Sequence, residues 1–274
     1  MAAFLSPVYA VEAGTNHQVD LGLITVATLQ QQSEAWVLLD ARPKAEWAAG
    51  HLPGAHSFSW EDYTRTDAQG IPYRPWPAQE LAAALGQLGI SEQTPLVVYG
   101  DADTSWGGEG WTVWLLAWLG HRGPIRLLDG GVQAWRQAQL PLTGETSAVK
   151  ESAAYQVAPR AELYISTEEI VQAPQAQTLV DVRSLLEWVK GRVPGAVRIP
   201  WEDFYQGENR APLTPDALQK LLARNEIDPS KPVVFYCAGG IRSAYAWLVY
   251  QLAGLPNGRN YEGSMEAWNR RSQP

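Results

Sequence analysis

Residues 37–62 read VLLDARPKAEWAAGHLPGAHSFSWED, and residues 178–203 read TLVDVRSLLEWVKGRVPGAVRIPWED. Aligned without gaps, the two stretches share 12 of 26 residues. The shared residues include the groups Asp-x-Arg, Glu-Trp, Pro-Gly-Ala and Trp-Glu-Asp. A match of this density in Trp, Gly and Pro indicates that the chain contains two copies of one unit.

The similarity continues outside these stretches. Residues 96–100 (LVVYG) parallel residues 233–237 (VVFYC), and residues 129–131 (DGG) parallel residues 262–264 (EGS). Between the copies lies a stretch without hydrophobic periodicity that is typical of a linker. We therefore expect four parts: an N-terminal extension (1–23), a first unit (24–142), a linker (143–163) and a second unit (164–274).

Short apolar runs alternate with helix signals in each unit. Leu179–Val182 and Val233–Tyr236 are runs of four residues, which is typical of strands buried on both faces of a parallel sheet. Capping signals and apolar composition predict helices after Ser166, Ser184 and Thr214, and over Ala244–Ala253. Strands that alternate with helices predict an α/β fold in which each unit has a mostly parallel sheet flanked by helices.

Composition excludes several classes of protein. The chain has 274 residues, 46% of them hydrophobic and 18% charged, which indicates a globular protein. A formal net charge of −8 is unfavourable for binding nucleic acid. The longest apolar stretch, Trp111–Leu119, is too short to span a membrane. We expect a monomer that binds neither nucleic acid nor membrane.

Cysteine and histidine usage bounds the chemistry further. The chain has one cysteine and four histidines, the latter all in its N-terminal half and without ligand spacing, so we expect no metal site, no cofactor and no intrachain disulfide. No Lys or Arg precedes Arg42, so the start lacks the basic region of a signal peptide. We expect a cytoplasmic protein, although an exported chain whose signal has been removed would have the same composition.

Cys237 is the clearest chemical difference between the two copies, because its counterpart is Gly100. It follows a predicted buried strand, and a short loop leads from it into a predicted helix. A side chain in this place lies at the carboxyl end of a parallel strand, where open α/β sheets bind ligands. The loop and helix start that we expect to hold an anionic sulfur comprise Ala238, Gly239, Gly240, Ile241, Arg242 and Ser243.

The chemistry of this loop favours a reactive thiolate. Two glycines allow a tight turn that directs N–H groups inward, and the start of the helix adds positive potential. Such an environment lowers the pKa of a thiol from about 8.5 toward roughly 3.5–7.5. Arg242 adds a permanent positive charge that can also hold an oxyanion.

Each residue singled out also has a structural interpretation. Cys237 could be a buried hydrophobe, Arg242 a surface charge or an interdomain ion pair, and Ser243 either a donor to the sulfur or a helix cap. Asp181 and Arg183 recur in the first copy, which favours a structural ion pair, and Glu187 fits a helix cap without a catalytic role. The glycine-rich loop 100–110 of the first copy could be a phosphate-binding loop, but its carboxylates would repel a phosphate. We therefore expect it to be a degenerate active-site loop that helps cover the interdomain cleft.

The duplicated Asp-x-Arg…Glu-Trp…Gly-x-x-Pro-Gly-Ala pattern, the cysteine loop and the late Gly-x-x-x-x-Trp resemble the rhodanese family over about residues 24–272. The two copies in tandem, with a cysteine only in the second, resemble the two-domain thiosulfate and 3-mercaptopyruvate sulfurtransferases. The resemblance implies two rhodanese-like domains, the first non-catalytic and the second catalytic. It implies ping-pong transfer of sulfur from a small anionic donor, through a persulfide on Cys237, to cyanide or a thiol.

The loop departs from both tandem types. Tandem thiosulfate enzymes often have two basic residues there, and mercaptopyruvate enzymes often have Cys-Gly-Ser-Gly, whereas residues 237–242 resemble the Cys-x-x-Gly-x-Arg loop of many single-unit bacterial rhodaneses. We favour thiosulfate as donor, with 3-mercaptopyruvate as the alternative. A cysteine phosphatase is less favoured. The resemblance implies that the loop of such enzymes has five residues between Cys and Arg, whereas four residues separate Cys237 from Arg242. A non-catalytic binding module remains the third alternative.

Overall fold

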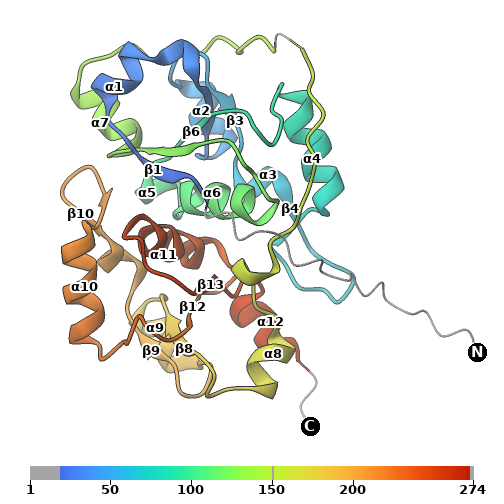
Figure 1. Cartoon of the computed structure of the whole chain (residues 1–274), viewed down its shortest axis with the longest axis vertical. Helices are drawn as coiled ribbons and strands as arrows, with labels where there is room; N and C mark the ends of the chain where they lie inside the picture. Colours follow the sequence, from blue (N-terminus) through green and yellow to red (C-terminus); the bar gives the residue numbers. More distant parts are fainter. Residues whose placement is uncertain (1–18, 150, 272–274) are drawn as a thin grey trace, which may run out of the picture.

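The computed structural model describes residues 19–149 and 151–271, and in them the chain forms two α/β domains (Figure 1). All strand pairs of the first sheet are parallel, and its strand order is β1-β7-β6-β2-β3. The strands are β1 (Leu21–Ile24), β7 (Ile125–Leu128), β6 (Leu96–Tyr99), β2 (Val37–Asp40) and β3 (His56–Ser57). Of the expected N-terminal extension, residues 1–18 lie outside the described residues, and β1 begins at Leu21.

The second sheet repeats this order with one strand fewer. Its strands are β13 (Gly258–Asn260), β12 (Val233–Tyr236), β8 (Thr178–Asp181) and β9 (Val197–Arg198), again all parallel. A single parallel bridge between Tyr164 and Asn260 stands where β1 pairs with β7 in the first sheet. The predicted strands and the α/β fold class are therefore confirmed.

Helices cover both sheets. In the first domain they are α1 (Val26–Gln31), η1 (Ser33–Ala35), α2 (Lys44–Ala49), α3 (Trp60–Tyr63), α4 (Ala78–Gln87), α5 (Ala102–Ser105), α6 (Gly108–Trp118) and α7 (Gly131–Gln137). In the second domain they are η2 (Ala161–Leu163), α8 (Thr167–Gln172), α9 (Leu185–Lys190), η3 (Trp201–Phe204), α10 (Pro215–Arg224), α11 (Ile241–Leu252) and α12 (Ser264–Arg270). None of the described helices is long and apolar enough to cross a membrane.

Three of the predicted helix starts are confirmed by their caps. Ser166 and Ser184 each form a reciprocal capping box, with Glu169 and Glu187 respectively. Thr214 caps α10 by accepting a hydrogen bond from the N–H of Ala217. The predicted helix 244–253 begins three residues earlier, at Ile241, because Gly240 in the left-handed conformation ends the cysteine loop and starts α11 directly.

The Asp-x-Arg motif forms the same buried ion pair in both domains, which confirms its structural interpretation. Arg42 Nη2 and Asp40 Oδ2 are 2.6 Å apart, as are Arg183 Nη2 and Asp181 Oδ2. Each arginine also donates to the carbonyl oxygen of the glycine that ends the following helix, at 2.8 Å in the first domain and 2.7 Å in the second. Removing one partner would leave a buried, uncompensated charge.

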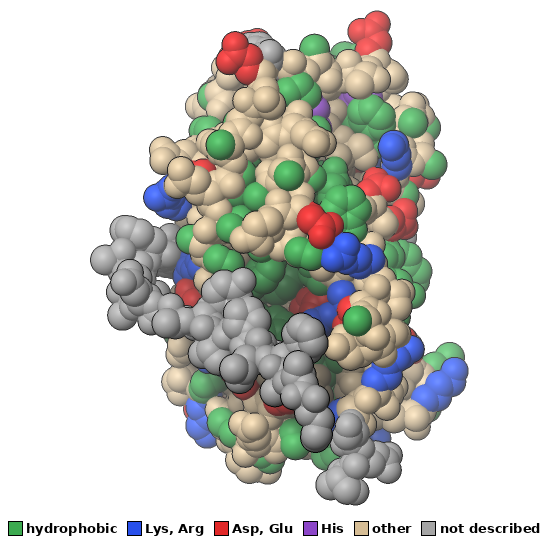
Figure 2. Space-filling view, turned by 90° about the vertical axis from the view of Figure 1, so that its right-hand side faces the viewer, with side chains coloured by type: hydrophobic (Ala, Val, Ile, Leu, Met, Phe, Trp, Pro, Cys, Tyr) green, Lys and Arg blue, Asp and Glu red, His purple; other side chains and the backbone are tan. Residues whose placement is uncertain are grey.

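Helices α6 and α11 pack side by side between the two sheets and join the domains (Figure 1). Gly110 in α6 lies against the backbone of Tyr245 in α11, so closely that a Cβ atom on Gly110 would clash with it. One cluster of buried apolar residues from both domains is continuous across this contact, and each domain has a further cluster of its own. On the face shown in Figure 2, hydrophobic side chains line a recess between the two halves, and acidic and basic side chains meet at its rim.

The segment between the domains is irregular but attached to the first domain. The N–H groups of Ala153, Ala158 and Arg160 donate to backbone carbonyls of that domain at 2.8–2.9 Å. The segment is therefore packed along the first domain and does not act as a free tether.

Candidate active site

Cys237 lies directly after β12, at the carboxyl end of the central part of the second sheet. Its Sγ accepts a hydrogen bond from the backbone N–H of Gly240 at 3.1 Å. Its own N–H donates to Ser264 Oγ at 3.0 Å, which fixes the start of the loop. The thiol is thus anchored beside polar donors and is not simply packed among hydrocarbon side chains.

Gly240 shapes the loop through its backbone. It has φ 88°, and a Cβ atom there would clash with the carbonyl oxygen of Glu262. Any other residue would be strained in this conformation and sterically excluded. Gly240 therefore lets the loop turn into α11 with its N–H directed at the sulfur.

Arg242 is held by Glu187 in a two-pronged ion pair. Nη1 and Nη2 of Arg242 lie 2.9 and 2.7 Å from the two carboxylate oxygens of Glu187. The guanidinium is 12% exposed and both partners belong to the second domain, so it is neither a surface charge nor an interdomain ion pair. The hydrogen bond from Arg242 is the main reason that the pKa of Glu187 falls to about 2.

The environment of Cys237 lowers the pKa of its thiol. Burial acts in the opposite direction and is the largest single effect. The positive charge of Arg242 and hydrogen bonds from Ser243 and Gly239 together outweigh it. Among the described residues, neither Ala238 nor Ile241 hydrogen-bonds the sulfur; Ile241 instead packs in the core.

Ser243 is not the helix cap, since Gly240 occupies that position. Its hydroxyl lies 2.7 Å from Asn260 Oδ1 and 3.6 Å from Cys237 Sγ. One hydroxyl proton can point to only one of these acceptors, so Ser243 can alternate between Asn260 and the sulfur.

A tyrosine from the first domain covers the cysteine loop. Tyr73 lies so close over Gly239 that a Cβ atom there would clash with its ring. Tyr73 itself has φ 65° and packs edge-on against Trp60. With this cover in place, Cys237 is only 2% exposed.

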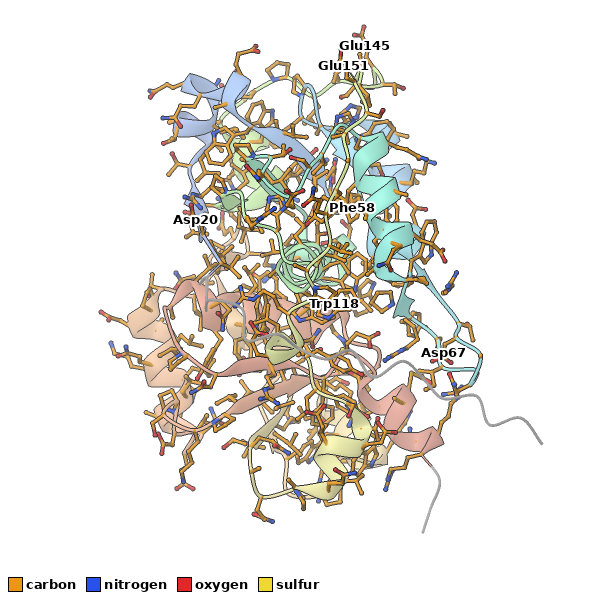
Figure 3. The ribbon with its side chains drawn as sticks, turned by 45° about the vertical axis from the view of Figure 1, so that its right-hand side comes forward. Asp20, Phe58, Asp67, Trp118, Glu145 and Glu151 are labelled. Carbon is orange, nitrogen blue, oxygen red and sulfur yellow. The ribbon has the colours of Figure 1, made fainter. Side chains whose placement is uncertain are left out.

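Tyr73 belongs to an arm, residues 64–75, that projects from the first domain. The two ends of the arm, β4 (Thr64–Arg65) and β5 (Arg74–Pro75), pair with each other. Figure 3 shows Asp67 at the outer end of this arm, beside the second domain. Arg74 forms an ion pair with the buried Glu262 of the second domain. Burial raises the pKa of Glu262 to about 7 although Arg74 opposes the shift.

The family is decided by comparison with known domains. A sequence profile described as the rhodanese-like domain matches residues 25–138 and 166–271, which is most of the chain. This chain belongs to the rhodanese-like family. Both halves match, so the family relationship covers the two domains separately.

Curated relatives of this rhodanese-like chain include sulfurtransferases of two kinds. A Pseudomonas aeruginosa protein described as a 3-mercaptopyruvate sulfurtransferase is 33% identical over 235 residues, covering 80% of this chain and 81% of the relative. A Mycolicibacterium smegmatis protein described as a thiosulfate sulfurtransferase is 29% identical over 233 residues, covering 78% and 81%. The chain is therefore a sulfurtransferase of this family.

Solved structures share the fold. SseA from Escherichia coli, a 3-mercaptopyruvate sulfurtransferase structure, matches with a TM-score of 0.79 at 20% identity, covering 88% of this chain and 98% of that one. EanB in complex with ergothioneine matches with a TM-score of 0.79 at 21% identity, covering 91% and 68%. At these identities the likeness shows the arrangement of the two rhodanese-like domains.

The first rhodanese-like domain lacks the chemistry of the second at the same place. Gly100 stands where the second domain has Cys237, and a Cβ atom on Gly100 would clash with the carboxylate of Glu109. That carboxylate is fully buried, and burial raises its pKa to about 7. A cavity of about 20 Å³, room for one water, remains beside it. An anionic sulfur would meet a carboxyl group here in place of a cation.

Sequence reasoning missed Tyr73, Asn260 and Ser264. The cover by Tyr73 depends on interdomain packing, which one domain's sequence does not reveal. The Ser264 position did carry a signal, because its counterpart in the first copy is Gly131. Comparing the copies position by position in the loops, and not only at the cysteine, would have found it.

Proposed function

We propose that Cys237 carries sulfur as a persulfide and that thiosulfate is the donor. The observation that carries the proposal is the position of Cys237 Sγ, 3.1 Å from the N–H of Gly240 and beside the charge of Arg242. These groups favour the thiolate before reaction and the negative outer sulfur of a persulfide afterwards.

In the first half-reaction the Cys237 thiolate attacks the outer sulfur of thiosulfate. A new S–S bond forms to Cys237, the S–S bond within thiosulfate breaks, and its electron pair leaves with sulfite. The product is a persulfide anion, which the same N–H and charge can hold. Because the thiol is 2% exposed, a covering group has to shift before the donor can approach, and we propose that this group is Tyr73, whose ring lies over Gly239.

In the second half-reaction a nucleophilic acceptor removes the outer sulfur. Cyanide attacks that sulfur and leaves as thiocyanate, and the electron pair of the broken bond returns to Cys237 as thiolate. No proton or external electron is needed in either step. The helix start of α11 therefore faces one negative charge throughout the cycle.

The charges around Cys237 favour thiosulfate over 3-mercaptopyruvate. Arg242 is the cation that acts on Cys237, and Glu187 already occupies both of its terminal nitrogens. A donor with its own carboxylate needs a further cationic partner to hold that group in place. Thiosulfate carries its charge next to the sulfur that reacts and needs only the one cation.

The donor is tested by steady-state kinetics with both compounds and cyanide as common acceptor. We expect kcat/KM for thiosulfate to exceed that for 3-mercaptopyruvate by about tenfold or more, roughly one ionic hydrogen bond in free energy. The reverse ranking would make 3-mercaptopyruvate the donor and would leave the proposal of a Cys237 persulfide unaffected. Cys237→Ser is the control, and it should be inactive with both donors.

A further inference from the structure

Exposed apolar side chains gather around the cysteine loop. Eight large hydrophobic residues are exposed among the described residues, and five of them are Tyr73, Trp106 and, on helix α9, Leu185, Leu186 and Val189. Printed contacts connect them to the site, because Tyr73 covers Gly239, the Arg242 guanidinium lies over the Trp106 ring, and Glu187 of α9 binds Arg242. We call these five side chains the rim of the site, because the elements that carry them contact the cysteine loop and come from both domains.

The largest part of this rim is helix α9. Leu185, Leu186 and Val189 are 59%, 73% and 64% exposed on a helix of six residues. Their counterparts on the equivalent helix α2 of the first domain are Lys44, Ala45 and Ala48. Folding of the repeated unit thus does not require large apolar residues at these positions. Only the domain with the thiol has them.

Basic residues near α9 also differ from their counterparts in the first domain. Lys190 and Arg192 are exposed and Arg198 is half-buried, and their counterparts in the first domain are Ala49, His51 and Ser57. The guanidinium of Arg192 lies over the Trp188 ring at 4.7 Å, which holds it at the edge of the helix. The one carboxylate of α9, Glu187, is occupied by Arg242. Residues 184–198 therefore carry three basic side chains and one carboxylate that is already paired, so this stretch is locally cationic in a chain with net charge −8.

We propose that α9, with Leu185, Leu186 and Val189 as its apolar centre and Lys190, Arg192 and Arg198 as its cationic rim, docks an acidic protein that takes sulfur from Cys237 on a thiol of its own. The inference rests on the proposed persulfide function. Cyanide and thiosulfate need no docking surface, whereas a protein whose thiol must reach Cys237 has to rest on the rim of its site. Contact on apolar residues and long-range attraction by complementary charge are the usual features of such an interface.

The transfer to such a protein balances without further reactants. The acceptor thiolate attacks the outer sulfur of the persulfide, a new S–S bond forms to the acceptor, and the Cys237 thiolate is released. In an acceptor with two neighbouring thiols, the second thiol then displaces hydrosulfide. The acceptor is oxidised to a disulfide and the transferred sulfur is reduced.

The test uses reduced thioredoxin as a small acidic dithiol protein, thiosulfate as donor and hydrosulfide release as readout. In the variant L185S/L186S/V189S we expect the KM for thioredoxin to rise at least tenfold and kcat/KM for cyanide to stay within twofold. Substituting the equivalent residues of α2 (K44S/A45S/A48S) is the matched control and should change neither value. Lys190→Glu with Arg192→Glu should raise the thioredoxin KM and weaken its dependence on salt.

Several outcomes would overturn the docking surface. A thioredoxin KM that is unchanged in the α9 variants would do so, as would sedimentation showing a dimer that the α9 variant dissociates, because the face would then bind a second copy. Failure of the persulfide itself would abolish turnover with cyanide as well as with thioredoxin. A binding experiment separates failure of docking from failure of the persulfide. Labelled thioredoxin is bound to the Cys237→Ser protein, with and without the α9 substitutions, and anisotropy is measured. Loss of affinity on substitution supports docking.

Discussion

Arg242 and Glu109 occupy equivalent positions in the two domains, each two residues after the left-handed glycine that caps a long interface helix. Arg242 lowers the pKa of the neighbouring thiol, whereas Glu109 fills the space where a thiol would begin. The two domains thus have the same backbone fold, with the basic Arg242 in one and the acidic Glu109 in the other at the equivalent position. This reversal accounts for the confinement of the proposed chemistry to the second domain.

Removing the charge of Arg242 should raise the pKa of Cys237. In Arg242→Gln we expect the pH midpoint of Cys237 alkylation by iodoacetamide to move upward and kcat/KM for thiosulfate to fall by about a hundredfold. Arg270→Gln, which alters an exposed pair with Glu266 on α12, is the control and should change neither quantity. An unchanged midpoint in Arg242→Gln would mean that the backbone alone sets the thiol pKa.

Glu187 restrains Arg242, so releasing it should strengthen the site's attraction for anions. In Glu187→Gln we expect the pKa of Cys237 to fall and the KM for thiosulfate to decrease several-fold, because the guanidinium is no longer neutralised. Glu46→Gln makes the same change on the equivalent helix of the first domain and should have no effect. A higher KM in Glu187→Gln would show that Glu187 is needed to place Arg242 for the donor.

Glu109 should make stability depend on pH around neutrality. Burial raises its pKa to about 7, so the folded state keeps the proton to higher pH than the unfolded chain does. This group therefore costs stability progressively as pH rises from about 4.5 to 7, by roughly 3 kcal/mol in all. We expect Glu109→Gln to raise Tm at pH 8 and to leave it nearly unchanged at pH 4.5. A lower Tm at pH 8 would indicate that the carboxylate is specifically stabilised.

Tyr73 should control access to the thiol. In Tyr73→Ala we expect Cys237 to react at least tenfold faster with a bulky maleimide and only slightly faster with iodoacetamide, since the ring over Gly239 is removed. Tyr73→Phe keeps the ring and is the matched control. Equal acceleration with both reagents would point to general loosening of the arm, and no acceleration would show that the thiol is reached by another route.

Much of the fold was predictable because its determinants are local. The buried four-residue strands, the capping boxes at Ser166 and Ser184 and the Asp181–Arg183 pair all join residues close in the sequence. The duplication added a second, independent copy of each signal. Local hydrogen bonding and hydrophobic periodicity are sufficient for such features.

The interdomain features were not predictable in this way. The contact of Tyr73 with Gly239 and the ion pair of Arg74 with Glu262 join residues from different domains. Their partners depend on how α6 and α11 pack, which no local pattern specifies. The early start of α11 was missed because its N-cap is a left-handed glycine without a side chain to signal it.

The most direct test of the central claim is the intact mass of the protein after incubation with thiosulfate and removal of excess donor. The account predicts that the wild-type chain gains the mass of one sulfur atom, that cyanide removes it, and that Cys237→Ser gains none. A wild-type chain that gains no sulfur, or a Cys237→Ser chain that gains one, would contradict it.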